Sequence, residues 1–200
     1  MRPDRNARRE YIAAFRELVS RIERSLAGLP KRLLPIRMYV AGGAALHLYT
    51  GARVSRDIDA VFSRRVALPE DLQIAYEDAD GAARLLYFDR QFNETLTLMH
   101  EDALKDSKRL TLNGIDPKVL EVRLLSPLDL AVSKLGRLSS QDREDVATLA
   151  RRRLIDSASL RRRAEAAVTA YVGDTERVRG SIALACRIVT DIEKRKRDRE

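Results

Sequence analysis

Residues 40–62 read V-A-G-G-A-A-L-H-L-Y-T-G-A-R-V-S-R-D-I-D-A-V-F, and this stretch predicts both the fold class and the chemistry of the chain. An apolar strand ends in Gly42-Gly43, a short helical run follows, and a second apolar strand carries Asp57 and Asp59. Residues i and i+2 of a strand point to the same face, so we expect both carboxylates to reach one metal ion. Hard oxygen ligands of this kind suit Mg²⁺.

The glycine pair predicts a phosphate site. Glycines at the start of a helix let a phosphate approach the backbone, where free N–H groups and the helix dipole favour anions. An Asp-x-Asp pattern alone is usually a solvated face, and Gly-Gly alone is usually a turn. The two patterns together, with apolar flanks on both strands, favour a site for Mg²⁺ and a nucleoside triphosphate.

This constellation resembles the nucleotidyltransferase superfamily, which has the polymerase-β-like fold. Gly42, Gly43, Asp57 and Asp59 match the family's glycine pair and Asp-x-Asp strand. The resemblance implies an α/β fold with a mixed twisted sheet flanked by helices, and transfer of a nucleoside monophosphate from an NTP. Two alternatives stay open for the residues before the carboxylates: Ser55 and Arg56 bind phosphate, or they only cap the strand entry and face solvent.

Composition favours a polyanionic partner and excludes several classes of protein. The chain has 200 residues, 44% of them hydrophobic, a net charge of +8 and a pI of about 9.9. Such a balance favours nucleic acid through counterion release. A single cysteine, Cys186, excludes a disulfide framework and is expected to be a small core residue. With no apolar stretch of about eighteen residues and no signal peptide, we expect a cytoplasmic protein without a membrane segment.

The periodicity predicts strands in the first part of the chain and helices only after residue 125. The alternation stops at Leu125, so we expect a catalytic core with an N-terminal helix over residues 1–125 and a C-terminal helical bundle over 126–200. Strands are expected over 36–41, 58–62, 72–76, 84–88, 108–112 and 118–125. Helices are expected over 4–27, 43–49 and 101–106 and from about 126, 139, 156 and 175, with a frayed tail over 193–200.

A second motif lies at residues 125–149, which read L-S-P-L-D-L-A-V-S-K-L-G-R-L-S-S-Q-D-R-E-D-V-A-T-L. Lys134 falls on the first predicted helix of this stretch. Asp142 and Asp145 are three residues apart on the next, so they share a face. Without the first motif, two amphipathic helices with Asp–Arg surface pairs would be the simpler interpretation.

Together with the first motif, the stretch resembles the AbiE-type toxin nucleotidyltransferases of type IV toxin–antitoxin systems. The resemblance implies that Lys134 contacts the nucleotide phosphates and that Asp142 or Asp145 lies close to the site, without choosing between them. It also implies a toxin with a separately encoded antitoxin and an RNA acceptor, tRNA in some relatives.

A third acid, on a neighbouring strand, is usual in the superfamily, where it acts as a base or completes a second metal site. Glu121, just before the lysine helix, is the first choice, and Asp89 is the rival. The predicted catalytic set is therefore Asp57, Asp59, Glu121 and Lys134.

Two other functions remain open at this stage. A small-molecule enzyme, such as an aminoglycoside nucleotidyltransferase, would use the same core, although a net charge of +8 argues against an acidic cleft for a cationic drug. A non-catalytic nucleotide- or RNA-binding module would keep the fold without the transfer. The sequence does not choose the NTP, the acceptor, the antitoxin or the oligomeric state.

Overall fold

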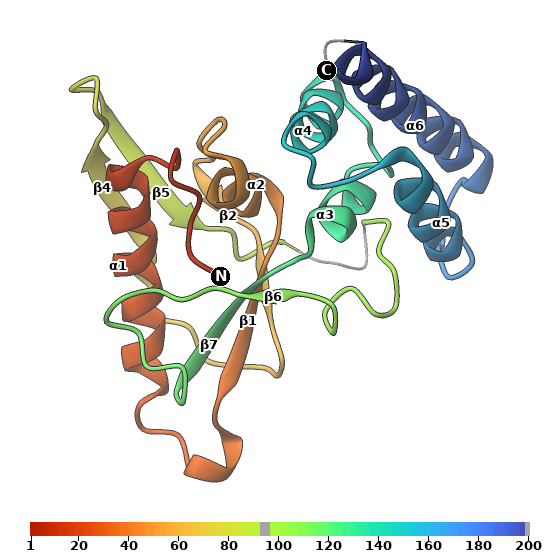
Figure 1. Ribbon diagram of the computed structural model, residues 1–200. Helices are drawn as coiled ribbons and strands as arrows, with labels where there is room; N and C mark the ends of the chain where they lie inside the picture. The colour runs from red at the N-terminus through yellow and green to blue at the C-terminus, as the bar shows by residue number, and fades with distance from the viewer. Residues whose placement is uncertain (93–96, 199–200) are drawn as a thin grey trace. The chain divides into compact units, whose positions relative to one another are not determined.

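The computed structural model describes residues 1–92 and 97–198, and it confirms the predicted mixed α/β fold with a C-terminal set of helices (Figure 1). Residues 1–92 and 107–124 form a compact sheet unit, and residues 97–106 and 125–198 form a compact helical unit. These units differ from the expected domains 1–125 and 126–200 in where residues 97–106 belong. None of the described helices combines the length and the apolar composition that crossing a membrane requires.

The sheet unit contains two sheets in place of the single sheet expected. The first has the order β3-β1-β7-β6, with β1 parallel to β7 and antiparallel to β3; the second has the order β2-β5-β4. The strands are β1 (Ile36–Val40), β2 (Asp57–Ile58), β3 (Ala60–Phe62), β4 (Gln73–Glu77), β5 (Ala83–Phe88), β6 (Lys108–Arg109) and β7 (Leu120–Leu124).

The predicted carboxylate strand over residues 58–62 is wrong in one respect, because it is interrupted at Asp59. The Asp59 carbonyl accepts a hydrogen bond from Ala41, just after β1, at 2.8 Å, whereas the Ile58 carbonyl accepts one from Asp89, just after β5, at 3.1 Å. Successive carbonyls of an extended chain point to opposite sides. The segment therefore lies between β1 and β5 and changes sheets at Asp59.

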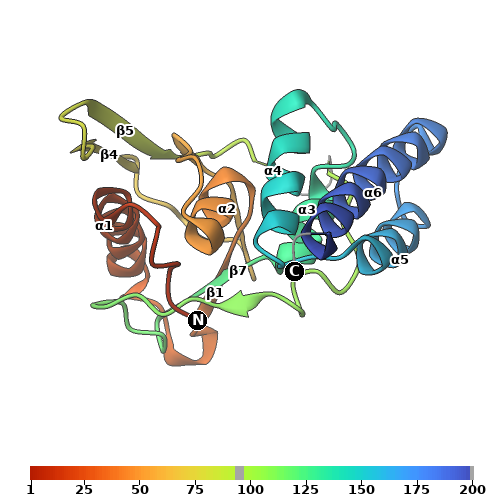
Figure 2. The same cartoon turned by 45° about the horizontal axis from the view of Figure 1, so that its top comes forward.

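Helix α1 (Arg9–Leu26) covers one face of the second sheet, where it contacts β4 and β5 (Figure 2). Its buried residues recur every three or four positions, as expected for an amphipathic helix: Tyr11, Ala14, Phe15, Leu18, Val19, Ile22 and Leu26. Helix α2 (Gly42–Thr50) follows β1 and ends at Gly51, whose φ of 65° is the left-handed conformation common after a helix. A short 3₁₀ turn, η1 (Lys31–Leu33), links α1 to β1.

The hairpin predicted around Asn113-Gly114 is only partly right. β6 and β7 pair antiparallel, but Lys108 is opposite Leu124, which centres the connection near Asp116. The Asp116 carbonyl accepts hydrogen bonds from Val119 and Leu120. Pro117 has no N–H to contribute to a ladder. The strands expected over 108–112 and 118–125 are shorter, at Lys108–Arg109 and Leu120–Leu124.

Four helices form most of the helical unit: α3 (Pro127–Ser133), α4 (Ser140–Arg151), α5 (Ser157–Val168) and α6 (Thr175–Arg197). The predicted starts are confirmed, because Ser126, Ser139 and Asp156 each accept a hydrogen bond from a first-turn amide. The expected fraying from residue 193 is wrong, since α6 continues to Arg197; residues 199–200 lie outside the described chain.

The element predicted within residues 94–106 is also corrected. Residues 97–106 contain no helix and have turns over 101–105, whereas residues 93–96 lie outside the described part of the chain. This segment is held to the helical unit by Arg163 of α5, which donates to Asp106 at 2.8 Å and to both oxygens of buried Asp129 at 2.7 and 3.0 Å. Cys186 is buried in α6, as predicted.

Candidate active site

The Asp59 carboxylate lies directly against the first residue of α2. Gly42 has a φ of +58°, and a Cβ on it would lie 1.7 Å from Asp59 Oδ2. The residue must therefore be glycine for two reasons, the left-handed backbone and the lack of space. The predicted glycine–carboxylate pair is thus in contact, and the contact joins the start of α2 to the break between β2 and β3.

Gly43 makes an equally close approach to the segment before the carboxylates. A Cβ on Gly43 would lie 2.6 Å from Ser55 Oγ and 3.1 Å from the Nη1 of Arg53. The Ser55 hydroxyl donates a short hydrogen bond to Asp57 Oδ1. The glycine pair, the serine and the two carboxylates therefore form one connected group at the start of α2.

The donor set of this group fits Mg²⁺. Asp57 and Asp59 supply carboxylate oxygens, and Mg²⁺ typically takes one or two protein carboxylates together with substrate phosphates and water. The residue before α2, Ala41, makes no side-chain cap, and the start of a helix favours an anion. Among the described residues, no three His, Cys, Asp or Glu side chains gather into a metal-binding group, so the fit depends on the substrate completing the coordination.

Two buried aromatic residues, Tyr11 and His47, stack edge to face with their ring centroids 4.7 Å apart. His47 Nε2 accepts from the Arg8 amide at 3.0 Å, so Nδ1, 2.6 Å from the Ala52 carbonyl, carries the proton. Burial lowers the pKa of His47, which keeps it neutral. Burial is also the main reason that the Tyr11 pKa is raised, and the negative charges of Asp57 and Asp59 add to the effect. Both residues are packing groups near the carboxylates.

The two candidates for the third acid lie in different places. Asp89 is the β5-side neighbour of Asp59, because its amide bonds the Ile58 carbonyl, and its carboxylate accepts from the Gln91 amide at 2.8 Å. In the register of β7 and β1, Glu121 is opposite Arg37. The Arg37 carbonyl accepts a hydrogen bond from the Ser63 amide, so Glu121 is level with Ser63, which is four residues beyond Asp59. That offset is about 13 Å along the strand. Glu121 is also ion-paired with Arg123. The arrangement favours Asp89 as the neighbour of the carboxylate pair.

Lys134, Asp142 and Asp145 form a buried cluster within the helical unit. The Lys134 ammonium donates to Asp145 Oδ2 at 2.7 Å and lies 3.8 Å from Asp142 Oδ1, with the lysine side chain 8% exposed and both carboxylates 2% exposed. Gln141 donates to the other oxygen of Asp145 at 3.0 Å. The structure therefore brings these three predicted residues together, with Asp145 as the nearer partner of the lysine.

Asp142 has a structural role at the start of α4. It closes a capping box with Ser139, and Arg137 donates to its two oxygens at 2.8 and 3.0 Å. Burial by itself would raise the pKa of Asp142, but the hydrogen bonds from Arg137 and Ser139 outweigh it and lower the pKa to about 2. Asp145 takes no part in this cap. The capping role therefore distinguishes Asp142 from Asp145, between which the sequence did not choose.

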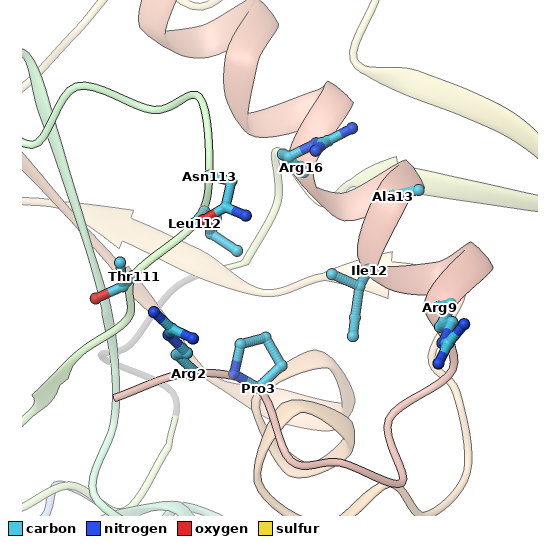
Figure 3. Close-up of a pocket in the computed structure, with 9 residues that line it drawn as sticks. All are labelled: Arg2, Pro3, Arg9, Ile12, Ala13, Arg16, Thr111, Leu112 and Asn113. Atoms are coloured by element: carbon cyan, nitrogen blue, oxygen red, sulfur yellow. The ribbon is translucent and has the colours of Figure 1, made fainter.

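A basic pocket of about 290 Å³ lies elsewhere in the sheet unit, between α1, the N-terminal segment and residues 111–113 (Figure 3). Arg2, Arg9 and Arg16 line it and no acidic residue does; Ile12 projects from α1 between the two helical arginines. The pocket contains none of the predicted site residues. Its charge suits a polyanion.

One charged group at the carboxylate site, the Arg53 guanidinium, was not predicted from the sequence. Arg53, and not Arg56, has its guanidinium beside Gly43 and Ser55. Arg56 is exposed, and its carbonyl accepts from the Tyr87 amide at 2.8 Å. Both arginines precede Asp57 in an irregular segment, where no periodicity could indicate which one turns towards the glycines.

We expect Gly42→Ala to destabilise the protein, because the left-handed φ costs about 1–2 kcal/mol and overlap with Asp59 costs roughly 1–3 kcal/mol more. Gly28→Ala is the matched control, since a Cβ there meets nothing within 4 Å. Urea unfolding of both variants measures the difference. Equal stabilities would mean that the Gly42–Asp59 contact does not constrain the fold.

We expect Lys134→Met to cost about 3–5 kcal/mol of unfolding free energy, because Asp145 would be left as a buried charge without its lysine. Arg137→Met should cost only about 1 kcal/mol, since the Arg137 side chain is 79% exposed. Denaturant titration compares the variants, and adding Asp145→Asn to Lys134→Met should recover part of the loss. Similar losses for Lys134→Met and Arg137→Met would contradict a buried pair.

The comparison with protein families agrees with this geometry. A family profile described as nucleotidyltransferase of unknown function (DUF6036) matches residues 17–194, a span that includes both the glycine–carboxylate group and the lysine–aspartate cluster. No curated protein and no solved structure matches the chain significantly. The prediction of a nucleotidyltransferase is confirmed at this level, and the chain belongs to the DUF6036 family of nucleotidyltransferases of unknown function.

Proposed function

We propose that this enzyme transfers a nucleoside monophosphate from an NTP to an RNA acceptor in a Mg²⁺-dependent reaction. The observation that carries the proposal is the contact of Asp59 with Gly42, with Asp57 linked through Ser55 to Gly43. It puts two metal-binding carboxylates beside the uncapped start of a helix, where phosphates are favoured.

In the proposed reaction, the acceptor hydroxyl oxygen attacks the α-phosphorus, the bond from that phosphorus to the β-phosphate bridging oxygen breaks, and pyrophosphate leaves. Asp57 and Asp59 would hold Mg²⁺, which neutralises charge on the attacking and leaving oxygens when bound. The first-turn amides of α2 and the Arg53 guanidinium would bind the triphosphate. Asp89, the neighbour of Asp59, is the better placed group to take the acceptor proton, with Glu121 as the remaining alternative.

The resemblance to AbiE-type toxins supports a role for Lys134 as a phosphate ligand and for Asp145 as its partner. Asp145 accepts a hydrogen bond from the Lys134 ammonium at 2.7 Å, which fixes the lysine side chain. Asp142 caps the start of α4, and Arg137 forms an ion pair with Asp142. In this proposal, Lys134→Ala weakens NTP binding more than Arg137→Ala does.

An RNA acceptor is supported by charge. The net charge is +8, and the pocket with Arg2, Arg9 and Arg16 adds a concentrated basic surface within the sheet unit. Neutralising phosphates with arginine releases counterions, so binding should weaken steeply with salt. The resemblance further supports a tRNA acceptor and a toxin that is paired with a separate antitoxin.

A nucleotide-binding module without transfer is the second candidate. One observation favours it: no third acidic side chain joins Asp57 and Asp59 in a metal-binding group within residues 1–92 and 97–198. An aminoglycoside-type transferase is less favoured, because the basic charge would repel a cationic drug. Incubation with labelled NTPs, Mg²⁺ and either RNA, protein or small acceptors separates the candidates, since only a transferase labels an acceptor.

We expect Asp57→Asn and Asp59→Asn each to lower label transfer at least a hundredfold, since a lost metal ligand removes several kcal/mol of transition-state stabilisation, about 1.4 kcal/mol per factor of ten. Asp71→Asn is the control, because Asp71 is exposed and pairs only with Arg21 among the interactions described for it. Melting temperatures confirm folding. Wild-type turnover in both site variants would rule out the proposed metal ligands.

The toxin role makes a separate prediction in cells. Expression of the wild-type chain alone should arrest bacterial growth, whereas Asp59→Asn at the same protein level should not, because the arrest requires transfer. Growth curves with matched immunoblots measure this. If both strains grow equally, the toxin role is removed and the transferase proposal stands.

A further inference from the structure

The face of the second sheet that carries Asp57 exposes two large apolar side chains of β5, beside the polar residues Gln73 and Glu77 of β4. Burial alternates over the second half of β5, where Leu86 and Phe88 are buried and Leu85 and Tyr87 are 45% and 40% exposed. Large apolar side chains with this exposure are few among the described residues, and two of them occupy one strand. An exposed aromatic and aliphatic pair of this kind is a feature of binding surfaces.

The register places this pair next to the carboxylates. Asp57 is directly opposite Tyr87 in the parallel pairing of β2 and β5, and Tyr87 is opposite Gln73 in the antiparallel pairing with β4. Paired residues project from the same face of a sheet, about 4.8 Å apart. Tyr87 and Asp57 are therefore neighbours on one face, and Leu85 continues that surface away from Asp57.

The two sides of the carboxylate segment differ in chemistry. On the β1 side are Gly42, Gly43 and the uncapped start of α2, which suit phosphates. On the β5 side are Tyr87 and Asp89, an aromatic ring and a carboxylate. If the triphosphate occupies the glycine side, the attacking hydroxyl must approach from the other side, because attack and departure are in line.

We propose that Tyr87 and Leu85 form a stacking platform for the terminal bases of a single-stranded RNA acceptor. This inference rests on the proposed function. An aromatic ring accepts any base, since every base has a π-face, and such stacking is tolerant of sequence. We assign a nucleic acid strand to this surface because the Tyr87 ring lies next to Asp57, where the acceptor of the proposed transfer has to present its hydroxyl.

The composition allows a direct test, because the chain has no tryptophan. Tyr87→Trp introduces the sole indole, whose fluorescence is quenched when a base stacks on it. Single-stranded RNA of mixed sequence should quench it in a saturable way. Val172→Trp is the control, because Val172 is 98% exposed in the helical unit and should show no saturable quenching. Absence of quenching in Tyr87→Trp would overturn the platform, as would equal quenching by double-stranded RNA or by NTP alone.

Affinity gives the second readout. Tyr87→Ala should weaken binding of a labelled RNA oligonucleotide about tenfold, whereas Tyr87→Phe should stay within about twofold, in line with stacking on a ring face. Anisotropy titrations without NTP measure this at constant salt, with melting temperatures as the folding control. Unchanged affinity in Tyr87→Ala, or equal losses in Tyr87→Ala and Tyr87→Phe, would overturn the inference.

The two proposals fail separately. Quenching by RNA together with no label transfer to any acceptor would leave the platform standing and remove the transferase proposal. Transfer to RNA with an unquenched Tyr87→Trp variant would leave the transferase proposal standing and remove the platform.

Discussion

The close approach of the Asp59 carboxylate to the Gly42 backbone is the constraint on which the site depends. It occurs where β1 turns into α2 and where the segment 57–62 passes from one sheet to the other, so it joins three elements at one point. Any side chain on Gly42 would occupy the position of the carboxylate, and the left-handed φ would strain it further. The position of Asp59, one of the proposed metal ligands, therefore depends on a residue that has no side chain.

This junction determines the surroundings of the Asp57 and Asp59 carboxylates. Within a regular strand, both Asp57 and Asp59 would sit in a continuous ladder on one sheet. The break at Asp59 puts β1 on one side of the segment and β5 on the other. The carboxylates therefore lie between the two glycines at the start of α2 and a strand that exposes Leu85 and Tyr87. In the proposed transfer of a nucleoside monophosphate, one neighbour suits the triphosphate and the other suits the acceptor. The backbone hydrogen bonds of Ile58 and Asp59 keep the two sides separate.

The helical unit contains a cluster of charged side chains that are buried. Lys134 is shared between two carboxylates, Asp142 is satisfied further by Arg137 and the capping box, and Asp145 is satisfied by Gln141. Buried ions are tolerated only when paired and hydrogen-bonded. The cluster therefore fixes the C-terminal end of α3 against the N-terminal turn of α4, and it holds the lysine that the family resemblance connects with phosphate.

What the sequence determined by itself was local. The caps at Ser126, Ser139 and Asp156, the helix after Gly42 and the spacing of Asp57 and Asp59 were all predicted, because each depends on residues within one turn or one strand. Tertiary structure alone decided the break at Asp59 and the register that centres the β6–β7 connection near Asp116. It also decided that Arg53 lies beside Gly43, that Asp89 neighbours Asp59 and that Tyr87 is exposed. These features depend on which strands become neighbours. Strand pairing joins residues that are far apart in the chain. The two-residue periodicity of a strand does not indicate which strands become its neighbours.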